Sequence, residues 1–515
     1  MSYILVLDVG TTNIKAFLFD KNAEIVSQAK RRQNYITNED PGQVEQNPKE
    51  VWDLSRQVIE EVMRSKSLKA ADINSLGLST YRASFLFWDK NSGKTYSNIN
   101  TWQDNRAAEY ALKMTNKFGI KLIRAIGKVA YPLTKNVKML TASMLKFDAT
   151  YASARTGYFL EKNPEIKKLI QFPNTSIVWG TIDSWILWNL TKGKIHATDY
   201  SNASATGLLD PFKLTWNTIV LKPFKIPKYI LPELKETQGD IGTTDLFGGG
   251  KIPIKAIIAD QQASLFGQCC FNYGDMKVTN GTGSFSDLNT GDKAYASKRR
   301  LYPLVAWVIN GQPTYLLEGL SHNTGNIIDW IQSELGLFKD PAETEKMALS
   351  VNSTEGVYFL PTFTSGISFP YWSPAKGTLF GLTLNTKKEH IIRAVLEGIC
   401  FRIKDIVDGI IKDTNIEIKK IKADGGVSRN KFVLQFLADI LGIEVERSQN
   451  PETTALGAAF VAGLATEFWK SKEELTNKIR KVERVFVPKI TEEERNRKYE
   501  CWGDIINRSL NYQNI

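Results

Sequence analysis

The chain has 515 residues, of which 42% are hydrophobic, so it is long enough for two or three domains with large cores. Its net charge of +11 comes from basic residues interleaved with acidic ones, which indicates solvated surface and argues against a nucleic-acid-binding module. The four cysteines have no metal-ligand spacing, no apolar run is long enough for an integral membrane segment, and no secretory leader precedes the first strand, so we expect a cytoplasmic protein without structural zinc.

Two short apolar runs with a small turn between them open the chain. Residues 3–8 and 14–19 have the composition of β-strands, and they enclose Gly10, Thr11 and Thr12. Such a turn can direct backbone N–H groups and threonine hydroxyls toward phosphate oxygens, and glycine lets the backbone come close. An ordinary hairpin turn can have the same composition. The segment therefore predicts a β-hairpin whose turn is a candidate phosphate loop.

Strands and helices alternate through the first half of the chain. Asn47 and Pro48 have the character of an N-cap and a first helical residue, and apolar residues recur at helical spacing after them. Residues 73–78 and 84–88 have strand character. This alternation is typical of layered α/β packing.

A shift in composition marks the middle of the chain. Residues 239–252 are rich in Gly, Thr and Asp, and strand-like runs resume after them. We therefore predict two α/β domains, residues 1–252 and residues 253–515.

A second hairpin of the same kind lies in the later half. Residues 277–280 and 285–288 are strand-like and enclose Gly281, Thr282 and Gly283. Two candidate phosphate hairpins in one chain suggest two related halves that clamp a nucleotide between them.

A strand, a Gly-Gly turn and a helix follow in that order. Residues 418–423 have strand character, Gly425 and Gly426 form the turn, and residues 431–441 form an apolar helix that Gly442 ends. The turn leaves a flat surface for a purine or ribose, and the N-terminal amides of the helix would lie close to phosphates.

Carboxylates at strand ends are the candidate reactive groups. Asp8 directly precedes the first turn, where a carboxylate beside phosphate is costly unless a divalent cation lies between them, so it is a candidate Mg²⁺ ligand or else a turn cap. Asp260 follows the apolar run 256–259, and the end of a strand is where open α/β sheets bind ligands. A helix N-cap is its alternative role. The three histidines lie beside neither hairpin.

The three motifs, in this order, resemble the two phosphate motifs and the adenosine motif of the superfamily of sugar kinases, Hsp70 and actin. The stretches between them are similar to glycerol kinases and their FGGY carbohydrate kinase relatives. The segments that carry this resemblance are residues 41–48, 102–106, 181–185, 198–204, 259–263, 370–372 and 454–459. The resemblance implies an α/β fold of two actin/hexokinase-like (ribonuclease H-like) domains with an ATP cleft between them. It also implies ATP and Mg²⁺ as cofactors, a small polyol or sugar as acceptor, and a homodimer.

The resemblance further implies roles for individual residues. Asp260 would be the catalytic base, and it would bind the metal together with Asp8. The expected ATP-binding residues are Thr11, Thr12, Asn13, Lys15, Thr282, Gly283, Gly325, Gly426, Val427 and Asn430. The expected acceptor-binding residues are Arg82, Trp102, Tyr131, Asp260, Gln261 and Phe285.

Two positions depart from the glycerol kinase pattern. Lys15 stands where these enzymes usually have arginine, which keeps the charge but loses the bidentate fork. Ala83 replaces the acid of an Arg-Glu pair that holds the polyol hydroxyls, while Arg82 is kept. A divergent animal branch, glycerol kinase 5, is similar in having an Arg-Ala replacement and an Ile-Ala-Asp-Gln-Gln stretch like residues 258–262.

Three functions stay open on the sequence alone. The first is ATP-dependent phosphorylation of glycerol to glycerol 3-phosphate by in-line transfer with an Asp base. The second, which Ala83 favours, is phosphorylation of another polyol or a ketose sugar. The third is a catalytically weak ATP-binding interaction protein.

Overall fold

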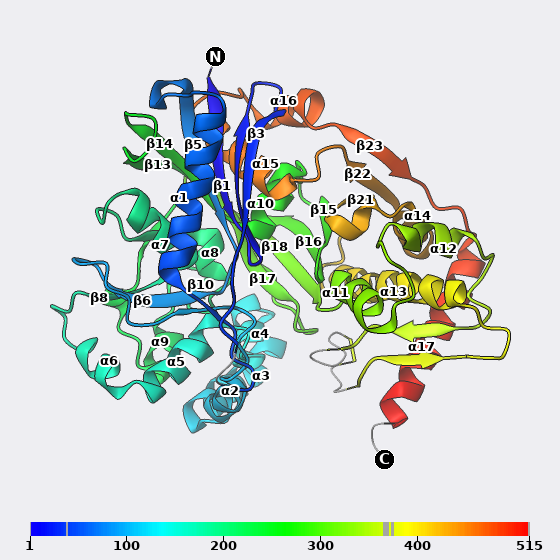
Figure 1. Cartoon of the computed structure of the whole chain (residues 1–515). Coiled ribbons are helices and arrows are strands. Elements are labelled where there is room, and N and C mark those ends of the chain that lie inside the picture. Colours follow the sequence, from blue (N-terminus) through cyan, green and yellow to red (C-terminus); the bar gives the residue numbers. More distant parts are fainter. Residues whose placement is uncertain (1, 38–39, 364–369, 372–374, 513–515) are drawn as a thin grey trace.

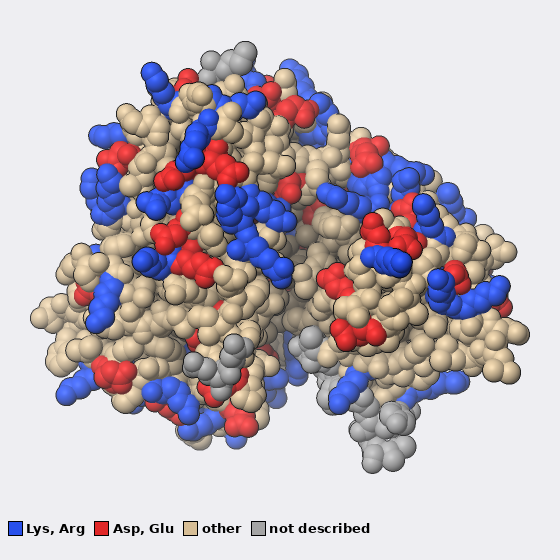
Figure 2. Space-filling model, viewed as in Figure 1, with Lys and Arg blue, Asp and Glu red and all other residues tan. Residues whose placement is uncertain are grey.

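The computed structural model describes residues 2–37, 40–363, 370–371 and 375–512. Two lobes, each built around a β-sheet, lie side by side (Figure 1). The space-filling view is hollowed between the lobes, and basic and acidic side chains are interleaved over this face (Figure 2). Trp372, at the end of the segment 370–372 that contributes to the family resemblance, lies outside the described residues.

The first lobe is organised by a six-stranded sheet. Its strands, in spatial order, are β13 (Gln238–Thr244), β14 (Ile252–Ala259), β5 (Ile73–Thr80), β1 (Tyr3–Val9), β2 (Asn13–Phe19) and β3 (Ile25–Arg32). The central strand β1 is apolar on both faces and almost entirely buried, because helices cover both sides of the sheet. Helix α1 (Pro48–Ser65) packs on β2 and β3, and α15 (Thr453–Leu464) packs on β1, β5 and β14.

A seven-stranded sheet organises the second lobe. Its strands, in spatial order, are β17 (Tyr302–Ile309), β18 (Gln312–Ser321), β16 (Ser284–Gly291), β15 (Met276–Asn280), β21 (Lys420–Asp424), β22 (Glu444–Ser448) and β23 (Val482–Phe486). Helices α13 (Lys388–Thr414) and α14 (Lys431–Leu441) pack on this sheet, and α17 (Glu492–Tyr512) packs on α14.

The two sheets repeat one topology. In the first, β1 is antiparallel to β2 and parallel to β5, which is parallel to β14. In the second, β15 is antiparallel to β16 and parallel to β21, which is parallel to β22. The expected pair of ribonuclease H-like domains is therefore confirmed, and both predicted hairpins form as the first two strands of their sheets.

The division between the sheets differs from the predicted boundary at residue 252. Strand β14 begins at that point, but it hydrogen-bonds in parallel to β5 and antiparallel to β13, so it belongs to the first sheet. The glycine-rich stretch before it forms β13 and the loop that joins these two strands. The chain passes to the second sheet only after α10 (Asp260–Gly267).

Helices α10 and α15 cross between the lobes at very short distance. A Cβ atom on Gly457 would lie 1.7 Å from the carbonyl oxygen of Ala263, and one on Gly267 would lie 2.1 Å from the carbonyl oxygen of Thr453. Only glycine permits this approach. The crossing fixes α10, and with it the position of Asp260, against the strand end of the first sheet.

The lower part of the first lobe surrounds a small sheet (Figure 1). The strands of that sheet, in spatial order, are β4 (Glu45–Gln46), β7 (Ile99–Asn100), β6 (Phe85–Asp89) and β8 (Ile177–Thr181). The helices of this part are α2 (Ala108–Thr115), α3 (Phe118–Thr134), α4 (Val137–Ser143), α5 (Ala152–Lys162), α6 (Pro164–Leu169), α7 (Ile182–Leu190), α8 (Tyr200–Ser204) and α9 (Thr218–Phe224).

Minor elements complete the chain. Two-stranded sheets pair β10 (Leu209–Asp210) with β11 (Thr215–Trp216), β9 (Ala197–Asp199) with β12 (Glu233–Lys235), and β19 (Tyr358–Leu360) with β20 (Thr378–Phe380). Helices α11 (Gly325–Trp330) and α12 (Glu343–Leu349) lie in the second lobe, and α16 (Lys472–Glu474) precedes β23. Among the described residues, no helix combines the length and apolarity that crossing a bilayer requires.

Candidate active site

The turn of the first hairpin is held by its own backbone and by neighbouring side chains. The Gly10 N–H donates to the Asn13 carbonyl at 3.0 Å. The Thr11 carbonyl accepts from the Gln46 amide at 2.9 Å and from the Tyr35 hydroxyl at 3.1 Å. These bonds fix the turn, while Thr12 stays exposed to solvent and can reach a ligand.

The turn of the second hairpin docks against the start of α11. The Gly325 N–H donates to the Gly281 carbonyl at 3.0 Å, and the Thr324 N–H donates to the Thr282 carbonyl at 3.0 Å. A Cβ atom on Gly283 would lie 2.5 Å from the Ser321 carbonyl oxygen, so this turn too needs a residue without a side chain.

A cavity of about 470 Å³ opens beside this second turn, large enough for a nucleotide. Five of the ten predicted ATP-binding residues line it, namely Thr282, Gly325, Gly426, Val427 and Asn430. The Gly-Gly turn packs closely on the hairpin, and glycine at position 425 makes this possible. Gly425 has a φ of +89°, and a Cβ atom on it would lie 2.4 Å from the Asn280 carbonyl oxygen.

Sequence reasoning missed the residues that form the opposite wall of this cavity. That wall is formed by Ile328, Asp329, Asp340, Pro341, Ala342, Thr344 and Glu345. These residues belong to α11, to α12 and to the loop between them, and no short motif marks them. Thr11, Thr12, Asn13, Lys15 and Gly283, which were also predicted to bind ATP, are not among the lining residues.

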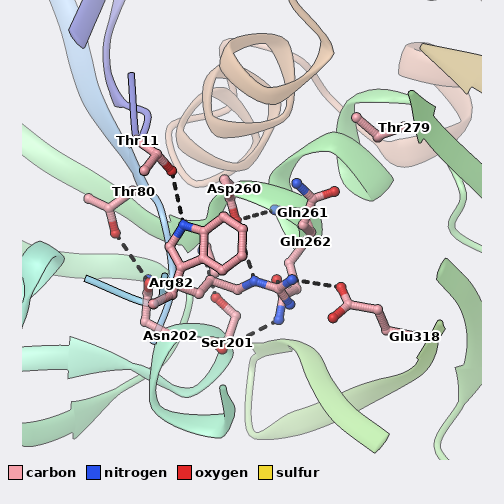
Figure 3. A network of polar contacts seen from close by, with 12 residues as sticks. Thr11, Thr80, Arg82, Ser201, Asn202, Asp260, Gln261, Gln262, Thr279 and Glu318 are labelled. Atoms are coloured by element: carbon pink, nitrogen blue, oxygen red, sulfur yellow. Dashed lines mark hydrogen bonds and ion pairs between the residues drawn. The ribbon is translucent and has the colours of Figure 1, made fainter. Parts of the chain in front are cut away.

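Asp260 and Arg82 lie next to each other (Figure 3). Asp260 is the first residue of α10 and directly follows β14, so its carboxylate stands at the carboxyl end of a parallel strand. The Arg82 Nε lies 3.4 Å from the Asp260 Oδ1. Burial raises the pKa of the Asp260 carboxyl, and the Arg82 guanidinium opposes that rise.

The Arg82 guanidinium is held on its other side by residues of both lobes (Figure 3). Its Nη2 donates to Glu318 Oε2 at 2.7 Å, and its Nη1 donates to Gln262 Oε1 at 3.3 Å. The Phe285 ring lies against the same guanidinium, with its centroid 5.9 Å from Cζ. We use the name acceptor pocket for the group of Asp260, Arg82 and Phe285, which the sequence predicts to bind the acceptor.

Trp102 is hydrogen-bonded to the first hairpin and to Ser84, whose hydroxyl donates to the Arg82 carbonyl at 3.2 Å. Its indole Nε1 donates to the Thr11 Oγ1 at 3.2 Å, and its backbone N–H donates to the Ser84 hydroxyl at 2.9 Å. The segment at residues 198–204 supports the pocket from behind, because the Ser201 hydroxyl accepts from the Ala259 N–H at 2.8 Å. The strand end that carries Asp260 is therefore fixed.

Two predicted acceptor-binding residues have other partners. The Gln261 side chain is buried, and its Oε1 accepts from Lys277 Nζ at 2.6 Å. Tyr131 lies on α3, where its ring faces Lys298 Nζ at 5.4 Å from the centroid. The contacts described for Tyr131 do not join it to Arg82 or Asp260.

A buried cluster of charges behind the pocket was missed by sequence reasoning. Asp287 and Glu318 lie directly opposite each other on β16 and β18. Lys277 Nζ lies 2.8 Å from Asp287 Oδ2, and both side chains are fully buried. Burial raises the pKa of the Glu318 carboxyl above its ordinary value, and the Arg82 guanidinium opposes that rise. Charged residues inside apolar strand sequences were the available signal.

The sequence matches both domains of one enzyme family. Residues 3–267 match the N-terminal domain of the FGGY family of carbohydrate kinases, and residues 276–466 match its C-terminal domain. The chain belongs to the FGGY family of carbohydrate kinases. It is accordingly an ATP-dependent carbohydrate or polyol kinase that uses Mg²⁺.

Relatives within this family match the whole chain. Glycerol kinase 5 of Danio rerio is 39% identical over 522 residues, which cover 100% of this chain and 97% of the relative. Glycerol kinase of Aquifex aeolicus (strain VF5) is 40% identical over 514 residues, 99% of each chain. The crystal structure of Plasmodium falciparum glycerol kinase with ADP superposes with a TM-score of 0.88 at 31% identity, covering 99% of this chain and 98% of that one.

Asp8 suits the Mg²⁺ that an FGGY kinase uses. Its side chain is buried and its Oδ1 has no hydrogen-bond partner within the described residues. Burial raises the pKa of Asp8 to about 7, and the carboxylates of Glu452 and Asp260 add to that rise while Lys15 opposes it. The part of the chain that the structure describes holds no cluster of three or more His, Cys, Asp or Glu able to bind a metal. Mg²⁺ in kinases commonly uses only one or two carboxylates together with phosphate oxygens and water, so the residues fit.

Lys15 forms an ion pair with a residue far away in the sequence. It stands opposite Asp8 on the β1–β2 hairpin, and its Nζ lies 2.6 Å from Glu452 Oε2, just before α15. Both side chains are partly exposed, so this surface pair contributes little to stability. Lys15 can leave Glu452 for a phosphate at small cost.

Proposed function

We propose that this kinase phosphorylates glycerol at a terminal hydroxyl and produces glycerol 3-phosphate. The relatives that match its full length are glycerol kinases at 38–40% identity. The observation that carries the proposal is the contact between Arg82 and Asp260, at the end of β14, with the Trp102 indole bonded to the first phosphate hairpin beside it. A cation, a carboxylate and an aromatic wall are suited to a small polyol.

In the proposed reaction the hydroxyl oxygen of the acceptor attacks the γ-phosphorus of ATP. The bond from that phosphorus to the bridging oxygen breaks, ADP leaves, and the hydroxyl proton passes to the Asp260 carboxylate as general base. Arg82 orients the remaining hydroxyls through charged hydrogen bonds. Asp8 and Asp260 would hold Mg²⁺, which neutralises charge on the transferred phosphoryl group when bound.

The nucleotide residues have proposed roles in the same arrangement. The terminal phosphates would contact the first hairpin through Thr11, Thr12, Asn13 and Lys15. They would contact the second hairpin through Thr282 and Gly283. The adenosine would occupy the cavity that Gly325, Gly426, Val427 and Asn430 line. Tyr131 and Gln261 would complete the acceptor pocket when ligands bind.

Ala83 is the observation that favours a second candidate acceptor. Its φ of +56° lies in the left-handed region, and its carbonyl accepts from the buried guanidinium of Arg155. No carboxylate extends from this position, so the pocket has one fewer group for a polyol hydroxyl and more room. A larger polyol or a ketose is the alternative acceptor, while a catalytically weak ATP-binding protein has no observation in its favour.

An ADP-release assay over a panel of glycerol, longer polyols and ketoses tests these alternatives. We expect turnover to depend on glycerol. The Asp260→Asn variant should lose about 10²–10⁴-fold in kcat while its affinity for ATP stays unchanged. Turnover with a ketose but not with glycerol would support the second acceptor, and near wild-type kcat in Asp260→Asn would remove the base from the mechanism.

Three broader expectations complete the proposal. We place the domain boundary between residues 267 and 276, where the two family matches end and begin. We also propose a homodimer that works in the cytoplasm. Light scattering at increasing protein concentration and cell fractionation test the assembly and the location.

A further inference from the structure

Helix α3 presents a row of large apolar side chains to solvent. Because an α-helix turns about 100° per residue, the five side chains of this apolar stripe fall within about 80° of each other. Their exposed fractions are 82% for Phe118, 49% for Leu122, 55% for Ile126, 70% for Val129 and 81% for Leu133. Contiguous exposed apolar surface on a helix indicates a contact with something outside the molecule.

The opposite face of α3 is fixed to the protein. Ile120 is buried there, and Gly127 lies so close to α4 that a Cβ atom on it would be 2.4 Å from the Ser143 backbone nitrogen. The helix therefore cannot rotate to bury its apolar stripe. In Figure 1, α2, α3 and α4 lie together at the lower edge of the first lobe.

The sequence that carries the stripe is basic. Residues 110–147 contain lysine and arginine but no aspartate or glutamate. Lys121 and Lys128 are exposed on one flank of the stripe, and Lys117 and Lys135 are exposed at the two ends of the helix.

The combination of an apolar stripe and flanking lysines indicates which kind of partner binds this face of α3. A second copy of the chain packed on the stripe through a two-fold axis would bring the same lysines together, which is repulsive. An anionic lipid surface accepts the apolar side chains at the boundary of headgroups and acyl chains and attracts the flanking cations. We propose that α3 docks the kinase on the surface of an anionic phospholipid bilayer, with the apolar stripe inserted and Lys121 and Lys128 on lipid phosphates.

Vesicle flotation with the full-length protein tests this proposal. We expect binding to vesicles that contain phosphatidylserine, weak binding to pure phosphatidylcholine, and loss of binding as salt increases. Each lysine near the surface contributes about fivefold in partitioning, so Lys121→Glu/Lys128→Glu should lose roughly 25-fold or more. Leu122→Ser/Val129→Ser should also reduce binding, since it removes apolar side chains from the inserted face.

A matched control lies on the surface helix α9 of the same lobe, where Ile219 and Lys222 are exposed. The Ile219→Ser/Lys222→Glu variant should bind vesicles like the wild type, and all variants should keep the thermal midpoint and kinase activity of the wild type. Failure to float with phosphatidylserine vesicles, or equal binding by all variants, overturns the proposal. So does a dimer, or a complex with an acidic protein, that the α3 variants abolish while vesicle binding persists.

Discussion

Arg82 and Glu318 join the two lobes of the kinase through a buried ion pair. Arg82 follows β5 of the first sheet, Glu318 lies on β18 of the second sheet, and 2.7 Å separates Arg82 Nη2 from Glu318 Oε2. The side chains are 9% and 6% exposed, so solvent does not screen the contact. The geometry of the acceptor pocket therefore depends on both halves of the chain.

Removal of the Glu318 carboxylate should weaken acceptor binding. In Glu318→Ala the guanidinium loses a charged hydrogen bond worth about 1.5–3 kcal/mol, and its orientation toward the acceptor is relaxed. We expect the acceptor kcat/KM to fall by roughly 10- to 150-fold, mainly through KM, with the KM for ATP nearly unchanged. Steady-state kinetics measures this loss. The matched variant Glu318→Gln should lose less of the acceptor kcat/KM than Glu318→Ala. An unchanged acceptor KM in both variants would contradict a positioning role.

The fully buried Lys277–Asp287 pair should be costly to break on one side only. Lys277→Met leaves the Asp287 carboxylate buried without its ammonium partner, which typically costs about 3–5 kcal/mol of stability. The double variant Lys277→Met/Asp287→Leu should recover most of that loss, because no uncompensated charge remains. Urea unfolding followed by fluorescence checks this. A double variant less stable than the single variant would show that the pair is not coupled in this way.

Asp183 should make stability depend on pH. Burial raises the pKa of its carboxyl from an ordinary 3.8 to about 7, and its Oδ2 accepts from the Thr198 hydroxyl at 2.6 Å. Between about pH 4 and 7 the folded chain keeps a proton that the unfolded chain releases, so the free energy of unfolding falls as pH rises through that interval.

The Asp183→Asn variant is neutral at every pH and should lack this contribution. We expect its thermal midpoint to decline less than that of the wild type between about pH 5 and pH 7.5, by the equivalent of about 2.5 kcal/mol. Differential scanning calorimetry at both pH values provides the measurement. Parallel pH profiles for the two proteins would mean that Asp183 is ionised in the folded state at acidic pH.

The crossing of α10 and α15 should not tolerate a methyl group. In Gly457→Ala the new Cβ would lie 1.7 Å from the Ala263 carbonyl oxygen, so the two helices must separate. We expect stability to fall by about 1–3 kcal/mol. We also expect a lower kcat, because α10 carries Asp260. Gly503 on α17 has open space around it, so Gly503→Ala serves as the control and should be neutral or slightly stabilising. Equal midpoints for the two variants would count against a tight crossing.

Local chemistry explains what the sequence revealed about the site. Both hairpins, the Gly425–Gly426 turn and the positions of Asp8 and Asp260 at strand ends depend on neighbouring residues, since turn conformation and strand ends are determined by a few adjacent positions. The positive φ of Gly425 and the end of α14 at Gly442 follow from the same short-range preferences.

Long-range packing decided the pairing of the strands and the contacts between them, because the sequence of a strand does not specify which strand it pairs with. The sequence assigned β14 to the second half, but pairing with β5 places it in the first sheet. Alternation along β15, β16 and β18 does not reveal that Lys277, Asp287 and Glu318 meet behind the pocket, since that depends on the register between strands. By itself, the sequence indicated a two-lobed kinase of the FGGY family and the carboxylates that we propose to be reactive. Only the tertiary structure decided how Arg82 is held and which face of α3 remains uncovered, because burial of charge and exposure of apolar surface are properties of the packed molecule.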